Sequence, residues 1–347
     1  MVSSRTGCRS PDATRVPPMP ADSASPSPVT KPAGGGPVDT QPGPPASAGS
    51  GQWLIGLATV LARLPLGLAR ALGAIAGLTA WAGSPGYRGK LRENLLRAGF
   101  VGIRPNIRAA IEAGRMAGEL PYIWLRPPEA IAQRVVCDDL AVLEEAERRG
   151  LGIVFLTPHL GAFEATARWY AQRAPITVMF RPPRKPLLGA LVAHARGGPG
   201  LRPVPAALSG VRAMLRALRA GAAVGLLPDQ VPGAGEGRWA MFFGEPAYTM
   251  TLPMKLVQST RASVVIAVGE RVSGGWRLRL ERFDGDPSPE ALNARMERMI
   301  LASPHQYLWG YNRYKRPHGV VGPLADERQA AASQQPSSAA QPGKPRG

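Results

Sequence analysis

The pattern of hydrophobic and polar residues divides the chain into four segments. Residues 1–51 are rich in Pro, Ser, Gly and Ala and show no apolar period, which predicts a disordered arm. Residues 52–83 are almost continuously apolar, and short apolar runs then alternate with amphipathic stretches. We therefore expect a hydrophobic segment at 52–83, one folded domain at 84–320 and a disordered, low-complexity tail at 321–347.

Within the folded domain, apolar runs typical of buried strands alternate with helical periodicity. The expected strands lie at 134–137, 151–156, 176–180, 222–227, 262–270 and 276–283. The expected helices lie at 107–124, 139–149, 160–173, 187–195, 208–220, 250–260 and 289–302. Ser273-Gly274-Gly275 is typical of a hairpin turn between the last two strands. The pattern predicts an α/β fold with a single mixed, largely parallel sheet flanked by helices on both faces, and an antiparallel pair near the end.

The hydrophobic segment 52–83 is long enough to cross a bilayer, which needs about 20 apolar residues. Its only charged residues, Arg63 and Arg70, share one helical face, and Pro65 weakens the helix. We expect the segment to be a membrane-associated helix that either spans once or lies in the interface with its arginines towards headgroups. A buried helix of a soluble protein is the alternative. Basic residues at 90–97 favour a cytoplasmic body.

The charge of the chain is strongly positive, with 42 Lys and Arg against 24 Asp and Glu and a formal net charge of +18. The two low-complexity ends carry only +1 each, so the folded part itself is basic. Such a charge favours an acidic partner: nucleic acid, an anionic membrane face, a phosphorylated substrate or an acidic carrier protein. The two cysteines, Cys8 and Cys137, provide neither a disulfide framework nor a cysteine-based metal site.

Among the four histidines, only His159 directly follows an expected buried strand and directly precedes an expected helix. That position, outside the carboxyl end of a strand, is where α/β folds place reacting groups. Glu164 follows five residues later, so the two side chains meet only if His159 lies in the turn and Glu164 on the first helical turns. A carboxylate on one imidazole nitrogen fixes the tautomer and leaves the other nitrogen as a general base. The alternative is a helix-capping histidine beside an unrelated glutamate.

The segment His159-Leu160-Gly161-Ala162-Phe163-Glu164, with further blocks in order, resembles the late lipid A acyltransferases of the lysophospholipid acyltransferase superfamily. The further blocks are Phe180-Arg181-Pro182 with Pro186-Leu187-Leu188, Leu226-Leu227-Pro228-Asp229-Gln230, Phe242-Phe243-Gly244 with Thr249-Met250-Thr251, and Gln306-Tyr307-Leu308-Trp309 with Arg313-Tyr314-Lys315-Arg316-Pro317. Several ordered blocks over roughly residues 52–320 are far more specific than one motif. Gly310-Tyr311-Asn312 departs from the commoner Leu-His-Arg of that family.

The resemblance implies a glycerolipid-acyltransferase-like fold for residues 84–320 and an acyltransferase of lipopolysaccharide synthesis, of the lauroyl or myristoyl type. The acyl group would pass from acyl carrier protein to a hydroxyl of a phosphorylated lipid A precursor, at the cytoplasmic face of the bacterial inner membrane. His159 would be the general base, held by Glu164. Arg181, Arg196 and Asp229 would bind substrate. From the residues alone, a surface position suits Arg181 equally well and Arg196 would be solvated, while Asp229 would either orient an active-site arginine or cap a turn.

Other chemistries lack their motifs. The chain has no Gly-x-Ser-x-Gly elbow, no Gly-x4-Gly-Lys-Ser/Thr loop and no His-Glu-x-x-His, so we expect no metal and no nucleotide cofactor. The nearest rival is a glycerophospholipid acyltransferase, but such enzymes usually carry Asp in place of Glu164 and a Glu-Gly-Thr-Arg block, which is absent here.

A rival of another class is a non-catalytic basic protein bound peripherally to membranes or to nucleic acid. The chain shows no basic segment interleaved with aromatic residues and no recognition-helix pattern, so we do not expect nucleic acid as a partner. Arg212, Arg216 and Arg219 form a stripe on one expected helix. A solvated face is the ordinary interpretation of such a stripe, and an acidic carrier or an anionic lipid suits it too.

Overall fold

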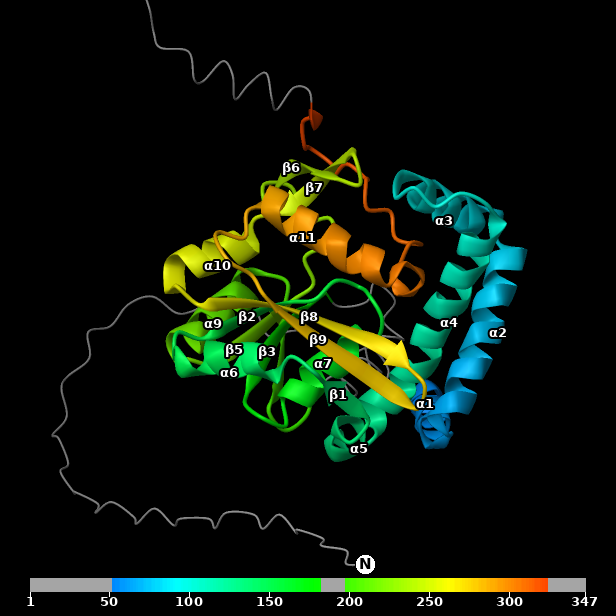
Figure 1. Ribbon diagram of the computed structural model, residues 1–347, viewed down its shortest axis with the longest axis horizontal. Helices are drawn as coiled ribbons and strands as arrows, with labels where there is room; N and C mark the ends of the chain where they lie inside the picture. The colour runs from blue at the N-terminus through cyan, green and yellow to red at the C-terminus, as the bar shows by residue number, and fades with distance from the viewer. Residues whose placement is uncertain (1–51, 182–196, 324–347) are drawn as a thin grey trace, which may run out of the picture. The chain divides into compact units, whose positions relative to one another are not determined.

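The computed structural model describes residues 52–181 and 197–323 (Figure 1). Four of the sequence predictions lie outside the described residues: the arm at 1–51, the helix at 187–195, Arg196 and almost all of the tail.

The centre of the fold is a seven-stranded sheet with the order β1-β9-β8-β2-β5-β3-β4. Its strands are β1 (Val135–Cys137), β2 (Ile153–Leu156), β3 (Ile176–Phe180), β4 (Leu201–Pro205), β5 (Ala223–Leu226), β8 (Ser263–Val272) and β9 (Gly275–Arg282). Neighbouring strands run parallel except β8 and β9, which form an antiparallel hairpin. The predicted mixed, largely parallel sheet with an antiparallel pair near the end is confirmed.

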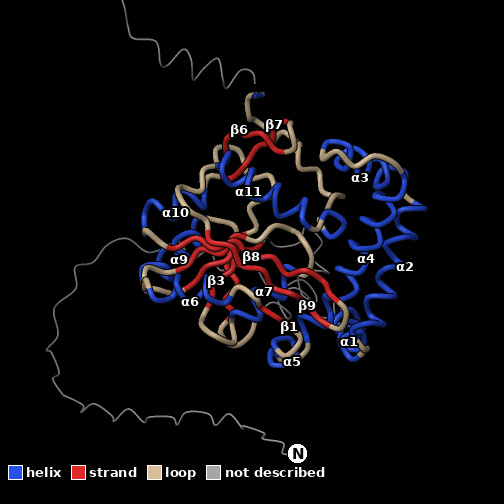
Figure 2. Tube along the Cα trace, in the orientation of Figure 1, coloured by secondary structure: helices blue, strands red, loops and turns tan. Residues whose placement is uncertain are grey.

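Helices cover both faces of this sheet, as predicted (Figures 1 and 2). They are α1 (Gln52–Arg63), α2 (Leu66–Gly83), α3 (Pro85–Arg97), α4 (Ile103–Leu125), α5 (Pro128–Ala132), α6 (Leu140–Arg148), α7 (Phe163–Tyr170), α9 (Leu208–Arg219), α10 (Leu252–Thr260) and α11 (Pro289–Ala302). All four residues of β2 are buried, because Val154 and Leu156 face the core beneath α9 to α11 while Ile153 and Phe155 face the core beneath α6 and α7. This double burial explains why the strand is apolar at every position.

Two strand features differ from the sequence prediction. The prediction missed β4, whose Leu-Arg-Pro-Val-Pro sequence is tolerated because prolines fit an edge strand that needs few backbone donors. The single-sheet prediction is wrong in one respect, since β6 (Gly237–Phe242) and β7 (Glu245–Met250) form a separate antiparallel pair (Figure 2). Their turn, Phe243-Gly244, has positive φ angles at both positions, as a tight hairpin requires.

The hydrophobic segment 52–83 forms two helices rather than one, because Pro65 separates α1 from α2. Among the described residues, α2 is the helix long and apolar enough to cross a membrane. It packs lengthwise against α4 (Figure 1). The close approach depends on glycine, since a Cβ atom at Gly73 would overlap the carbonyl oxygen of Gly114 on α4.

Arg70 of α2 turns inwards, whereas the interfacial alternative placed both arginines of this segment towards lipid headgroups. Its Nε donates to Glu119 Oε2 at 2.8 Å, and Nη1 and Nη2 donate to the carbonyl oxygens of Val272 and Gly275. Glu119 is fully buried, and its Oε1 also accepts a hydrogen bond from Arg271 Nη1 at 3.2 Å. A buried carboxylate needs such partners to offset its lost hydration, and together they fasten α2 and α4 to the β8–β9 hairpin.

Candidate active site

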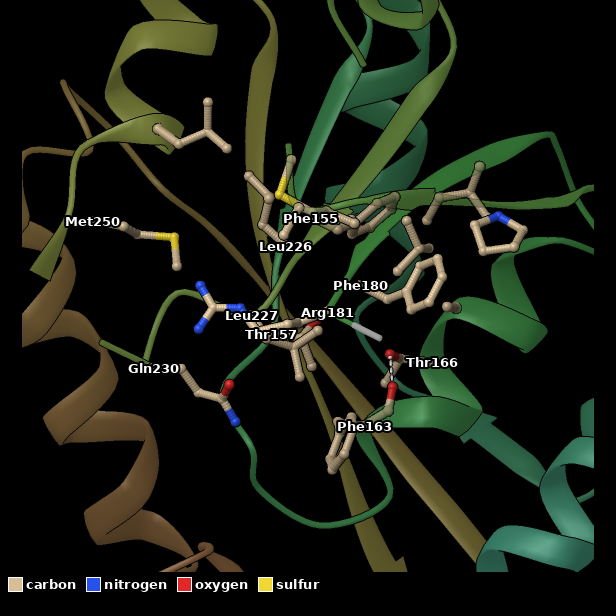
Figure 3. A pocket seen from close by; sticks show the side chains of 18 of the residues that line it. Phe155, Thr157, Phe163, Thr166, Phe180, Arg181, Leu226, Leu227, Gln230 and Met250 are labelled. Carbon is tan, nitrogen blue, oxygen red and sulfur yellow. Dashed lines mark hydrogen bonds between the residues drawn. The ribbon is translucent and has the colours of Figure 1, made fainter. Parts of the chain in front are cut away.

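A cavity of about 580 Å³ opens at the carboxyl ends of β2, β5 and β3 (Figure 3). The side chains that follow these strands line it: Thr157 and His159 after β2, Gln230 after β5 and Arg181 after β3. Its inner wall is mainly apolar and is built by Phe155, Tyr170, Ile176, Val178, Phe180, Leu201, Leu226, Leu278 and Leu280. The cavity therefore combines polar side chains at the carboxyl ends of the strands with a mainly apolar wall.

His159 lies in the turn between β2 and α7, as the sequence predicts. Backbone hydrogen bonds hold this turn: His159 O accepts from Leu308 N at 3.0 Å, and Gly161 N donates to Gln306 O at 3.0 Å. Gly161 has φ +62° and lies so close to β8 that a Cβ atom there would overlap the carbonyl oxygen of Gly269. Only glycine combines that backbone conformation with that close approach. The Gln-Tyr-x-Trp block thus supports the His159 turn.

Asp229 holds His159 at two points. Its Oδ2 accepts from the backbone N of His159 at 2.8 Å, and its Oδ1 lies 2.7 Å from the ring nitrogen Nδ1. Since an ionised carboxylate only accepts, Nδ1 carries the proton in this arrangement and Nε2 presents a lone pair. Burial raises the pKa of Asp229, but the charge and hydrogen bonds of His159 oppose it, and the pKa lies below its ordinary value. The pair therefore has the geometry of an oriented general base.

The other ring nitrogen of His159 faces the cavity side of the turn. Its Nε2 lies 3.1 Å from Gln230 Nε2, so the amide of Gln230 is placed to donate to the lone pair. The His159 ring also packs against Phe163, with ring centroids 4.8 Å apart. The histidine side chain is 14% exposed and its aspartate partner 2% exposed. Gln230 is a site residue that sequence reasoning missed, although it follows Asp229 in the same block.

Two charged side chains of α7 line the cavity beside His159. Glu164 is half-buried in the first turn, and Arg168, one helical turn later, is buried. Burial lowers the pKa of Arg168, and the charge of Glu164 opposes that effect. Sequence reasoning missed Arg168; its four-residue spacing from Glu164 was the available signal.

The predicted site residues fall into three groups. His159, Glu164 and Arg181 line the same cavity, and Arg181 is exposed at its rim. Asp229, expected to bind substrate, is instead buried with both carboxylate oxygens engaged by His159. Arg196 lies outside the described residues. That Glu164 holds the imidazole stays a prediction. In the structure the carboxylate beside Nδ1 of His159 belongs to Asp229.

Two buried side chains, Tyr307 and Arg313, interact with Asp229 from the interior of the protein. Tyr307 is buried, and burial together with the neighbouring Asp229 carboxylate raises its pKa well above the ordinary value. Arg313 is 2% exposed and donates to Tyr248 O at 2.8 Å and to Thr249 Oγ1 at 2.6 Å. Its positive charge faces Asp229 through the interior and favours the ionised carboxylate. The C-terminal Arg-x-Lys block therefore contributes to the site from within the core.

Comparison with known proteins identifies the family to which this site belongs. Residues 51–316 match the model of the bacterial lipid A biosynthesis acyltransferases. The chain belongs to this family. The matched range includes His159, Glu164, Arg181, Arg196 and Asp229.

Individual lipid A acyltransferases are similar to the chain over part of its length. It is 29% identical to a lipid A biosynthesis acyltransferase of Haemophilus influenzae over 198 residues, which is 54% of this chain and 61% of that protein. It is 26% identical to the lipid A biosynthesis lauroyltransferase of Escherichia coli over 58% of this chain and 69% of that protein. The Escherichia coli myristoyltransferase of lipid A biosynthesis is 27% identical over 58% and 64%. The chain thus spans about three fifths to two thirds of the length of these relatives.

No metal-binding cluster is present in residues 52–181 and 197–323, where no three His, Cys, Asp or Glu residues are grouped closely enough to hold an ion. That the chain uses neither metal nor cofactor stays a prediction.

Proposed function

We propose that this protein transfers a fatty acyl chain from the thioester of an acyl carrier protein to a hydroxyl group of a phosphorylated lipid A precursor. The observation that carries the proposal is the His159–Asp229 pair, whose histidine lines a mainly apolar cavity. Membership of the lipid A acyltransferase family supports the acceptor class, and the names of the lauroyl, myristoyl and palmitoleoyl relatives support a fatty acyl donor.

In the proposed reaction His159 acts through Nε2. The acceptor hydroxyl takes the place of the Gln230 amide at Nε2 and gives up its proton as its oxygen attacks the thioester carbonyl carbon. Collapse of the tetrahedral intermediate breaks the C–S bond, and the departing thiolate takes the proton from the imidazolium. An ester and a free thiol result, and His159 returns to its neutral form. Asp229 stabilises the transient imidazolium through Nδ1–H and keeps the ring oriented.

The remaining polar groups of the cavity suit the two substrates. The apolar inner wall fits the acyl chain, and a volume of about 580 Å³ is in the usual range for a ligand site. Arg181 at the rim and the predicted Arg196 are proposed to bind the phosphate groups of the acceptor. Glu164, four residues before Arg168 on α7, is proposed to balance the charge of this arginine and of the imidazolium when it forms.

We further propose that the protein lies on the cytoplasmic face of the inner membrane through α1 and α2. Their outward faces expose Trp53, Val60, Leu72 and Ile75, between 46% and 63% of each side chain. Because the inward face of α2 is fixed to α4 and through Arg70 to the β8–β9 hairpin, an interfacial position suits α2 better than a transmembrane one. The acceptor would then reach the cavity from the membrane.

The proposal is tested by measuring the rate of acyl transfer from an acylated carrier protein to a lipid A precursor in detergent, with the purified full-length protein. His159→Ala should lower turnover by about a thousandfold or more without loss of the fold, because the proton has no other acceptor. His318→Ala, at an exposed histidine, serves as the matched control. Near-normal turnover by a folded His159→Ala variant would contradict the mechanism.

Mass spectrometry of lipid A from a strain that lacks the protein tests the acceptor. Loss of one acyl chain would support lipid A and would identify the chain. Unchanged lipid A, with a changed acyl composition of glycerophospholipids, would instead favour a glycerophospholipid acyltransferase.

A further inference from the structure

One long stretch of the sequence contains basic residues but no acidic ones. Residues 165–228 include ten Lys or Arg and no Asp or Glu. In the structure this stretch begins within α7, contributes β3, β4, α9 and β5, and ends directly before Asp229. Such an asymmetry creates a positive field over one part of the surface, which attracts acidic partners and speeds their association.

Helix α9 carries three of the exposed positive charges of this stretch. Its inward face buries Ala213, Met214 and Leu218 against the sheet, and its outward face exposes Arg212, Arg216 and Arg219. Within the described residues none of the three arginines takes part in an ion pair. We call Arg212, Arg216 and Arg219 the basic face. Three arginines on successive turns, without acidic neighbours on the helix, leave a row of charges open to a partner.

The basic face adjoins the cavity of the active site. Leu208 and Val211 of α9 line the cavity, and so does the exposed Lys255 on the neighbouring helix α10. Arg212 directly follows Val211 in the chain. A partner bound to the basic face therefore lies beside the cavity, into which a flexible thioester arm would extend.

The basic face also lies away from the apolar helices. Helix α9 packs on β3, β4 and β5, whereas α2 is fastened to the β8–β9 hairpin on the other half of the sheet. Figure 1 shows α9 and α2 on opposite sides of the sheet. A membrane in contact with the outward face of α2 thus lies on the other side of the sheet from α9, which favours a soluble partner over a lipid surface.

We propose that the basic face is the docking surface for the acyl carrier protein that delivers the thioester. The inference rests on the proposed function, because that function requires an acidic protein carrying the acyl chain on a long arm. Arginines at the rim of a docking surface act mainly on encounter and affinity. Their contribution should therefore appear in the KM for the acylated carrier and should leave the chemical step at His159 unchanged.

The test compares two donors with the full-length protein: a lauroyl-loaded acyl carrier protein and lauroyl-pantetheine, a neutral thioester without protein. We expect Arg212→Glu with Arg216→Glu to raise the KM for the carrier at least tenfold, with little change in kcat. Rates with lauroyl-pantetheine should stay the same. The matched control is Arg148→Glu with Arg149→Glu at the end of α6, which changes the net charge equally but lies outside the stretch 165–228.

Ionic strength provides a second readout. For the wild type, the KM for the carrier should rise with added salt, and this dependence should flatten in the α9 variant, because screening acts on charges that the variant lacks. An unchanged KM for the carrier in the α9 variant would overturn the proposal. Equal losses with both donors would also overturn it, since they would show that the arginines act on the fold or the chemistry.

Two further results distinguish a failure of the proposed docking surface from a failure of the proposed acyl donor. If the wild type uses lauroyl-pantetheine but no acylated carrier, the carrier is not the donor, and both the docking surface and the proposed donor fail. If the α9 variant loses binding to vesicles of anionic phospholipid while transfer from the carrier is normal, the basic face is a membrane surface and the proposal is wrong. Normal vesicle binding with a raised KM for the carrier supports it.

Discussion

At the scale of single residues, the imidazole of His159 lies between the two neighbours Asp229 and Gln230, which follow β5 some 70 residues later in the chain. The sequence predicted the base and its position after β2, because an apolar run followed by a histidine and a helix is a local pattern. It assigned the orienting carboxylate to Glu164, the acidic residue nearest in the chain. The structure brings Asp229 to Nδ1 because β2 and β5 are adjacent parallel strands whose carboxyl ends meet.

The relative roles of Asp229 and Glu164 lead to a prediction. Asp229→Asn should lower kcat by about a hundredfold to ten-thousandfold, since the amide no longer stabilises the imidazolium and can favour the wrong tautomer. Glu164→Gln, with its side chain on the cavity wall, should cost less than Asp229→Asn and should affect KM as well. Steady-state kinetics of both variants provides the measurement. A larger kcat loss in Glu164→Gln would return the orienting role to Glu164.

Tyr170 at the inner wall of the cavity leads to a pH prediction. Burial, helped by the charge of Glu147, raises the pKa of Tyr170 to about 12. Because the folded-state pKa is raised above the unfolded value of about 10, the stabilisation is fully present below pH 10 and is lost as the pH rises towards 12. Unfolding by urea at about pH 9 and about pH 11 should therefore show a smaller loss of stability in Tyr170→Phe than in the wild type. If the wild type and Tyr170→Phe lose the same free energy of unfolding between these pH values, the pKa of Tyr170 is not raised in the folded state.

At the scale of elements, the sequence predicted those strands and helices whose burial repeats along the chain. β3 and α11 have the expected bounds, and β8 and β9 form the expected hairpin. The sequence missed β4, since its prolines are incompatible with a central strand and only its edge position allows them. It also missed the pairing of β6 with β7. The edge position of β4 depends on β3, some 20 residues earlier in the chain, and leaves no local period in the sequence.

The packing of α2 on α4 gives an element-level prediction. Gly73→Ala should destabilise the protein by about 1 to 3 kcal/mol or more, because the added Cβ has only backbone of Gly114 and Gly118 around it and the helices must move apart. Gly67→Ala in the same helix meets no atom within 4 Å and should be neutral or slightly stabilising, since alanine favours the helix. Thermal or urea unfolding measures both. Equal effects of the two substitutions would show that α2 and α4 are not in close contact.

At the scale of the whole molecule, the two substrates are expected to approach from different sides. The outward apolar face of α1 and α2 suits a lipid surface, and the basic face of α9 suits an acidic protein. The cavity, which His159 lines, is formed at the central strands between these two regions. The net positive charge is thus unevenly distributed over the molecule. The longest stretch of sequence without Asp or Glu, residues 165–228, forms the half of the sheet away from α2.

The exposed face of α2 provides the last prediction. Leu72 and Ile75 are 46% and 63% exposed on the side that faces away from α4. Replacing both by Asp removes apolar area worth about 1.5 to 3 kcal/mol per fully buried side chain and adds charge that a bilayer disfavours. We therefore expect at least a tenfold weaker partition of the full-length protein onto phospholipid vesicles, measured by sedimentation.

The control for this prediction is Leu301→Asp, at an equally exposed leucine near the end of α11 and outside the outward face of α1 and α2. It should leave vesicle binding unchanged. The fold should survive in all variants, because the inward contacts of α2 through Gly73 and Arg70 are untouched. If the α2 variant binds vesicles as tightly as the wild type, α2 does not contact the membrane. If it remains in the membrane fraction even after alkaline carbonate extraction, as an integral protein does, a transmembrane arrangement replaces the interfacial one.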